Sequence, residues 1–457
     1  MTLLYLGGLA ILVAVGFLFG RVRALAAANV TSLHSRPNYH GAFVALAVLI
    51  PMLFVLVVGL FTADKLVDAR AIDAYDPALS SSMDGLKRSA VLRDIQAINA
   101  GRFNGESSEA LRRAADVYAS ARTWSFVLMI GAGLALGLAG LAFGLKNLSA
   151  KFRARNYVER IVTVVLFACA ALAVVTTVGI VFSVLFESIL FFQKVSWIDF
   201  LFGFHWSPQM ALRPDQVGSS GAFGIIPLVV GTLLITVIAM MVAGPVGLFA
   251  AIYMAEYASP RFRSIAKPIL EILAGIPTVV LGFFAALTLA PIIRETGLTL
   301  GLNVASESAL AAGLVMGMMI IPFVSSLSDD VINAVPQTMR DGSYAMGATK
   351  SETIKRVVLP AAFSGIVSAF MLAISRAVGE TMIVVMAAGL AANLTFNPLE
   401  AVTTFTVQIK TILVGDQEFD SAKTLAAFAL GLVLFVFTLV LNVIALQIVK
   451  RYREQYD

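Results

Sequence analysis

The sequence predicts an all-α polytopic membrane protein in which every membrane crossing is a helix. Of the 457 residues, 59% are hydrophobic and only 13% are charged. Apolar runs of about 20 residues, long enough to span a bilayer, recur along the chain. Lysine and arginine gather in every second loop between these runs, as in cytoplasmic loops of membrane proteins. This composition lies far from that of soluble globular domains.

The remaining composition argues against several other classes of protein. Cys169 is the single cysteine, so no intramolecular disulfide can form. The three histidines, His34, His40 and His205, are not spaced as a metal site requires, and we expect no bound metal. The net charge of +5 comes from basic residues beside apolar runs, where they set topology. We therefore expect no nucleic-acid partner.

Nine apolar runs are read as membrane spans. The first lacks a basic segment before it, so we expect a retained span with its N-terminus outside rather than a signal peptide. The segments that then fall inside, together with the span-end residues Arg160 and Lys267, hold 18 Lys and Arg, against four in the short outside loops, which places the C-terminus in the cytoplasm. The predicted spans are 2–20, 41–61, 124–145, 160–190, 222–255, 267–293, 309–327, 360–392 and 422–449.

The long segment 62–123 falls outside and predicts a small helical insertion. The stretch Lys87–Ile98 has helical periodicity, Asn104-Gly105 marks a turn, and a second helix is expected over Ser108–Ala121. The predicted organisation is therefore two N-terminal transmembrane helices in 1–61, the insertion 62–123, a third transmembrane helix and basic cytoplasmic loop in 124–159, a six-span core in 160–449 with a cytoplasmic loop 328–359, and a cytoplasmic tail 450–457.

The loop before the eighth span contains the polar segment DGSYAMGATKSETIKRVVLP, Asp341 to Pro360. Asp341 is expected near the N-terminus of a short helix, where it would meet the helix dipole favourably. Gly347 permits a left-handed turn because it has no Cβ to clash, and a second short amphipathic piece then runs to Pro360. A helix–turn–helix this charged cannot lie in lipid. It is suited to docking a soluble protein, and the alternative is an ordinary solvated loop.

Two opposite charges, Arg376 and Glu380, lie near the middle of the predicted eighth span. A charge at that depth costs roughly 2.5 kcal/mol or more unless it is paired or faces water. Their i, i+4 spacing lets them pair on one helix face, which is the purely structural interpretation. A row of small residues lies beside them and favours a position facing protein rather than lipid. The row consists of Ala361, Gly365, Ala369, Ala373 and Ala377.

Proline and glycine interrupt two other predicted spans. Gly275 and Pro277 lie near the start of the sixth span, where a missing N–H and a flexible residue predict a kink or break. Gly244-Pro245 lies inside the fifth span. Such breaks are tolerated in lipid only where the backbone packs on protein or lines a cavity. Both a functional break and plain packing remain open at each position.

These segments resemble the phosphate-specific ABC transporter permeases of the PstC type. The loop matches the coupling motif of binding-protein-dependent importers, with Asp for Glu, Gly-Ser for Ala-Ala and Val for Ile. Further matches are FGIIPLVVGT, MAEYASPRFR, LEILAGIPTVVLGFFA and, most discriminating, RAVGETM at Arg376–Met382. The resemblance covers about 160–449, and residues 1–159 lie outside it. The matched coupling positions are Asp341, Gly342, Ser343, Gly347, Val357, Leu359 and Pro360.

The resemblance implies a fold and a function. The fold is a six-helix ABC importer permease core, here with three N-terminal transmembrane helices and a small helical periplasmic insertion. The function is inorganic phosphate import across the bacterial inner membrane, with Arg376, Glu380 and Thr381 in the substrate path. Implied partners are a PstA-type permease in a heterodimer, two ATPase subunits and a periplasmic phosphate-binding protein.

The sequence contains no GxxxxGK[ST] phosphate loop, so we expect a non-catalytic subunit that binds no cofactor. ATP and Mg²⁺ are then used by the partner ATPase. Two alternatives remain at this stage. One is a permease for another oxyanion or a phosphonate, and the other is a non-transporting membrane sensor scaffold.

Overall fold

The computed structural model describes residues 2–28, 33–75, 85–103, 108–149, 151–209, 221–414 and 421–452. Within these ranges the chain is almost entirely helical, with one pair of two-residue strands. Nine of the described helices are long and apolar enough to cross a membrane, which is the number that the sequence predicts. The all-α polytopic fold is therefore confirmed.

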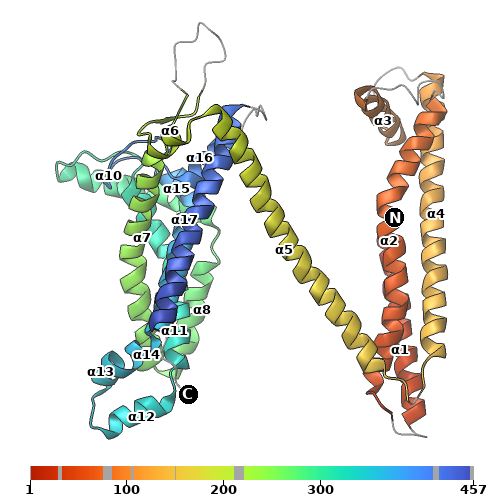
Figure 1. Cartoon of the computed structure of the whole chain (residues 1–457), viewed down its shortest axis with the longest axis horizontal. Helices are drawn as coiled ribbons and strands as arrows, with labels where there is room; N and C mark the ends of the chain where they lie inside the picture. The colour runs from red at the N-terminus through yellow and green to blue at the C-terminus, as the bar shows by residue number, and fades with distance from the viewer. Residues whose placement is uncertain are drawn as a thin grey trace. The chain divides into compact units, whose positions relative to one another are not determined.

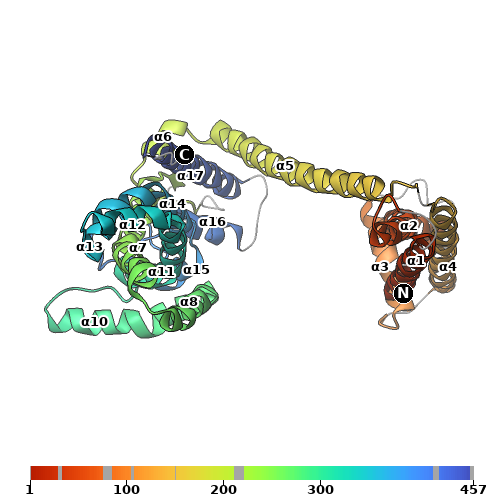
Figure 2. The same ribbon diagram turned by 90° about the horizontal axis from the view of Figure 1, so that it is seen from below.

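The chain forms two compact units, Met1–Val175 and Thr176–Asp457 (Figure 1, Figure 2). The division falls inside the long helix α5 (Ala154–Lys194), whereas the sequence placed the start of the six-span core at residue 160. The first part of α5 thus belongs to the first unit and the remainder to the second. Each unit is described by itself below.

In the first unit, α1 (Thr2–Ala28), α2 (Pro37–Tyr75) and α4 (Glu109–Lys146) pack as a bundle. Both α2 and α4 continue well beyond the apolar spans that the sequence predicts. Their ends enclose a small hydrophobic core with α3 (Gly85–Asn99), in which Ile95 is fully buried. The insertion is therefore two helix extensions plus α3.

The predicted helices of the insertion are confirmed in position. The Lys87–Ile98 stretch lies within α3, and α4 begins directly after Ser108, whose side chain accepts a hydrogen bond from the Leu111 N–H at 3.2 Å. This N-cap explains why the second helix starts where it does. The predicted turn at Asn104-Gly105 lies outside the described residues.

Glycines of α4 allow α2 to approach closely. Pro51 of α2 has no N–H to donate to the Ala47 carbonyl one turn earlier. Gly140 of α4 lies against that carbonyl, and a Cβ at Gly140 would overlap its oxygen. Helices in membranes associate through such small residues, because no hydrophobic effect drives them together in lipid.

The second unit contains the rest of the chain. A short strand pair, β1 (Trp206–Ser207) and β2 (Ala222–Phe223), is antiparallel with Trp206 opposite Phe223. The helices of this unit after α5 are α6 (Trp197–Phe202), α7 (Ile226–Ile252), α8 (Pro260–Ala274), α9 (Thr278–Phe284), α10 (Ala290–Thr299), α11 (Ala309–Ala334), α12 (Gln337–Ala345), α13 (Lys350–Thr353), α14 (Leu359–Val378), α15 (Met382–Ala387), α16 (Phe405–Leu413) and α17 (Ala422–Tyr452). Three π-helical turns interrupt them at Tyr253–Tyr257, Ala285–Leu289 and Ile354–Val358.

The core of the second unit forms where α11 packs against α7 and α14. Gly313 and Gly317 of α11 lie directly against α7, where an added Cβ would clash with Ile238 and crowd the Ala239 carbonyl. On α14, the predicted small-residue row is the packing row. Ala369, Ala373 and Ala377 are buried, and Gly365 lies against Val331 of α11.

The predicted break at Gly275 and Pro277 is confirmed, but its position relative to the span differs. Helix α8 ends at Ala274 with Gly275 as its C-cap, and Pro277 directly precedes α9. The sixth candidate span begins at Thr278, and the expectation that it begins at 267 is wrong. The charged, amphipathic α8 is a separate helix, since it carries Lys267 and two other cations within 15 residues.

No break occurs at Gly244-Pro245, because α7 continues through both residues. A Cβ at Gly244 would lie 3.0 Å from the Phe370 ring of α14. This glycine therefore serves packing between two helices.

The α2–α4 contact yields a prediction. Gly140→Leu should lower the stability of the chain by at least about 2 kcal/mol, because overpacking against backbone cannot be relieved by a side-chain rotation. The midpoint of thermal unfolding of the purified chain in detergent measures this loss. Gly131→Leu is the matched control, since no atom lies within 4 Å of a Cβ there. Equal losses at both positions would refute the packing argument.

Candidate functional site

The eighth span ends earlier than the sequence predicts, and this changes the relation between Arg376 and Glu380. Helix α14 ends at Val378 with Gly379 as its C-cap, so the expectations of a helix to 392 and of an i, i+4 pair on one helix face are wrong. Arg376 lies in the last turn of α14, and Glu380 lies beyond the helix.

The physical reason is a local competition for the Glu380 carboxylate. Its Oε1 accepts hydrogen bonds from the backbone N–H groups of Met382 at 3.0 Å and Ile383 at 3.4 Å. These are free N–H groups at the start of α15, where a negative charge is favoured. Glu380 therefore caps the next helix instead of continuing the previous one. Thr381, the third predicted path residue, is the half-buried N-cap residue of α15.

Arg376 is exposed on the surface of the second unit. Its guanidinium carbon lies 4.2 Å from the centroid of the Phe323 ring of α11, a cation–π arrangement that holds the head in place. Both charged residues fall in the described part of the chain, and there no ion pair joins Arg376 to Glu380. The guanidinium donors thus remain available to another group.

Polar residues accompany Arg376 along α14. Ser368 and Arg376 are exposed and Ser364 is partly exposed, while the adjacent small-residue row is buried against the core. Leu372, which lies between Ser368 and Arg376 at the same four-residue spacing, has 56% of its surface exposed. An apolar helix therefore exposes a serine and an arginine among apolar side chains on the outside of the unit. In a membrane, such a face requires water or another protein chain.

Sequence reasoning missed a polar cluster that holds the segment after α15. Gln408 of α16 accepts a hydrogen bond from the Trp206 indole at 2.9 Å and donates to the Leu390 carbonyl at 3.0 Å. The Thr406 hydroxyl donates to the Glu380 carbonyl at 2.8 Å. These buried bonds join α16 to the chain around the end of α14. Scattered threonines in an apolar sequence gave no periodic signal for this cluster.

The candidate coupling segment, Asp341 to Pro360, adopts the predicted helix–turn–helix together with the start of α12. Helix α12 ends at Ala345, Gly347 takes φ +85°, and α13 follows from Lys350. A capping box between Thr349 and Glu352 starts the second helix. The positive φ explains why glycine occupies position 347.

Three details of this segment differ from the sequence expectation. Asp341 is the fifth residue of α12, where it accepts a hydrogen bond from Gln337 at 3.1 Å, so its placement near the N-terminus is wrong. The seventh span continues to Ala334, so the loop begins later than 328. Pro360 does not close the second piece, because the helix runs on through a π-helical turn into α14 and Leu359.

The remaining coupling positions have separate environments. Gly342 has open space around its Cβ position. The Ser343 hydroxyl lies 2.9 Å from the Thr353 hydroxyl and ties α12 to α13. Pro360 is the second residue of α14, directly after the π-helical turn.

Arg340, which directly precedes Asp341, is a buried anchor that the sequence analysis counted only as a topology signal. Its guanidinium donates to the Ile332 carbonyl at 2.8 Å and to the Val335 carbonyl, at the C-terminal end of α11. It also forms an ion pair with Glu256 at 3.1 Å, with side-chain exposures of 10% and 7%. One side chain thus joins α12 to the π-helical turn after α7 and to the end of α11.

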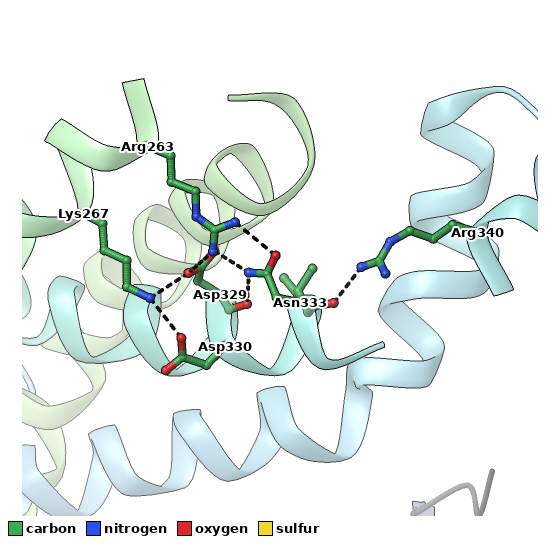
Figure 3. A network of polar contacts seen from close by, with 7 residues as sticks. Arg263, Lys267, Asp329, Asp330, Asn333 and Arg340 are labelled. Atoms are coloured by element: carbon green, nitrogen blue, oxygen red, sulfur yellow. Dashed lines mark hydrogen bonds and ion pairs between the residues drawn. The ribbon is translucent and has the colours of Figure 1, made fainter. Parts of the chain in front are cut away.

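A second buried network ties α8 to α11 (Figure 3). Asp329 is fully buried. Its carboxylate accepts two hydrogen bonds from Arg263, at 3.0 and 2.8 Å, and one from Lys267 at 3.0 Å. Asn333 donates to the same carboxylate at 2.9 Å. Asp330 binds Lys267 at 3.0 Å, and the bonds to Asp330 and Asp329 raise the pKa of Lys267, which lies outside the candidate spans.

This network gives a stability prediction. Asp329→Asn should lower the free energy of unfolding by roughly 2–3 kcal/mol. This is at the lower end for breaking a buried ion pair, because the two cations remain partly exposed. Asp330→Asn is the control and should cost less than about 1 kcal/mol, because its carboxylate is 63% exposed. Thermal unfolding of both variants in detergent tests the difference, and a control as destabilised as Asp329→Asn contradicts the assignment.

Two family models match the chain. Residues 6–176 match a family described as phosphate ATP-binding cassette transporter, and residues 243–454 match the binding-protein-dependent transport system inner membrane component. The N-terminal residues that lie outside the resemblance of the core therefore match a transporter family of their own.

The alignments with related proteins span at least half of this chain and most of each relative. A probable ABC transporter permease, YqgH of Bacillus subtilis, is 32% identical over 59% of this chain and 84% of that protein. PstC 1 of Mycobacterium bovis, a phosphate transport system permease, is 34% identical over 50% of this chain and 73% of its own. PstC of Mesorhizobium japonicum is 32% identical over 50% and 74%. The chain therefore belongs to the binding-protein-dependent ABC transporter permeases, in the group that includes the PstC phosphate transport permeases.

Proposed function

We propose that this chain is the permease subunit of an ATP-driven importer of inorganic phosphate, and that Arg376 contacts the anion in the path. The observation that carries this proposal is an exposed arginine at the end of an apolar helix, with its donors unpaired by Glu380. A guanidinium offers a planar fork of donors that fits phosphate. Relatives named as phosphate transport permeases support this choice of anion.

The surroundings of Arg376 suit a transient anion. Stacking on Phe323 fixes the guanidinium without neutralising it. The Glu380 carboxylate is engaged by two backbone N–H groups of α15, so it lies nearby without occupying the arginine. An anion would thus meet an available cation with a fixed negative charge close by, which favours release as well as binding.

The exposed polar face of α14 supports a second permease chain as partner. A face that carries Ser364, Ser368 and Arg376 cannot be stable against lipid, because each charge there costs roughly 2.5 kcal/mol or more. Cover by a PstA-type subunit would enclose this face and create a water-filled path between the two chains. We therefore infer a heterodimer.

A groove of about 540 Å³ between α12 and the following helical turn supports ATPase docking at the coupling segment. Met346 is 89% exposed beside it, and Glu352 and Arg356 supply charge at its wall. An exposed methionine with flanking charges is suited to a protein interface. Because the sequence lacks a phosphate loop, we infer that two separate ATPase subunits bind and hydrolyse Mg-ATP.

The same proposal sets the location and orientation. We place the chain in the bacterial inner membrane with the N-terminus outside and the C-terminus in the cytoplasm, supported by the 18 to four distribution of Lys and Arg. A periplasmic phosphate-binding protein would then deliver the anion to the outer side.

Arg376→Gln tests the path assignment. Losing a charge-assisted hydrogen bond of about 1.5–3 kcal/mol should reduce phosphate uptake roughly 10- to 100-fold. Uptake of labelled phosphate by cells that carry the whole transporter measures this, with membrane insertion checked by immunoblot. Arg294→Gln, an exposed arginine of α10, is the control and should transport normally. Wild-type uptake by Arg376→Gln removes this residue from the path, and preferential uptake of another oxyanion refutes phosphate as the substrate.

Gly347→Val tests the coupling assignment. A β-branched residue at φ +85° is strongly disfavoured, so the turn before α13 should distort and substrate-stimulated ATP hydrolysis should fall at least about 10-fold. Gly301→Val is the matched control. Gly301 also has a positive φ, +72°, and open space around its Cβ position, but it follows α10 and lies outside the candidate coupling segment. Equal ATPase activity in reconstituted complexes of the two variants would show that the segment does not dock the ATPase.

A further inference from the structure

A groove runs along the first unit between α2 and α4. It has a volume of about 320 Å³ and extends from Phe54 to Arg70 on α2. Those residues are 16 positions apart, which corresponds to about 24 Å along a helix. The two helices meet beside this groove at Gly59, which lies against the Met129 side chain.

The walls of the groove are apolar and open to the surroundings of the unit. Leu66, Trp124 and Leu128 line it with 61%, 68% and 69% of their surfaces exposed. The apolar run of α2 ends at Phe61, and polar residues begin at Thr62. The groove therefore starts within the hydrocarbon layer and continues into the membrane interface, where tryptophan is enriched.

A single cation closes the polar end of the groove. Arg70 is exposed there, and within the described ranges it has no ion-pair partner. A neighbouring hollow on the other side of Gly59 contains Asp64 as well as Arg122, so an acidic group opposes anions there. In the groove that ends at Arg70, by contrast, the apolar walls end at a single arginine and no acidic residue lines them.

We propose that this groove binds one anionic phospholipid of the surrounding membrane. Its acyl chain would lie between α2 and α4, with the headgroup phosphate on Arg70. The length agrees, because one leaflet with its headgroup region is about 20–22 Å thick. The polarity also agrees, since the apolar walls and the terminal guanidinium match an amphiphile with one phosphate at one end. A protein helix would not need this single terminal cation.

The test measures lipid retention by the full-length chain. The protein is reconstituted in nanodiscs that contain phosphatidylglycerol, extracted into detergent, and examined by native mass spectrometry. We expect one phosphatidylglycerol per wild-type chain. Val58→Trp fills the groove and should remove this lipid, and Arg70→Gln should weaken its retention about 10-fold, as loss of a charge-assisted bond predicts.

Matched controls distinguish the groove from general lipid contact. Val57 is 50% exposed but does not line the groove, and Arg93 is an exposed arginine of α3. Val57→Trp and Arg93→Gln should each retain the lipid as the wild type does. Equal retention by Val58→Trp and Val57→Trp overturns the proposal. It is also overturned if the wild type binds no lipid, or if another protein chain occupies the groove.

Discussion

The hydrocarbon layer offers no water to a free backbone N–H or carbonyl, and the structure of the second unit follows from this constraint. At three helix ends of this unit, a nearby side chain replaces the missing partners. Glu380 accepts from the first N–H groups of α15, Ser308 caps α11, and Arg340 donates to the last carbonyls of α11. Irregular backbone can therefore exist around α14 and α15, where we propose the anion path.

Helix identity could be predicted from the sequence, whereas helix ends could not. Apolar length identifies all nine candidate spans, Gly347 marks a real left-handed turn, and three alanines of the small-residue row of α14 are buried as their spacing indicates. The i, i+4 spacing of Arg376 and Glu380 could not show that the helix ends between them. That outcome depends on whether a carboxylate bonds forward to two N–H groups or back to an arginine, and periodicity does not distinguish the two.

Charge counting had a similar limit. Arg263, Lys267 and Arg340 contribute to the positive-inside signal however they are bonded, so a count cannot separate solvated cations from buried anchors. Recognising the anchors required knowing that α11 continues to Ala334 and carries Asp329 into the interior. The helix–turn–helix around Gly347 could thus be predicted from the sequence, while the bonds that attach it to the helices were visible only in the structure.

The position of Arg340 has a mechanical consequence. Its guanidinium is bonded to Glu256, in the π-helical turn that follows α7, and to two carbonyls at the end of α11. These two helices are also packed through glycines along their length, with almost no side-chain thickness between them. A displacement of α12 would therefore act on α7 and α11 at the same time. The ends of the two helices should move together when α12 is displaced.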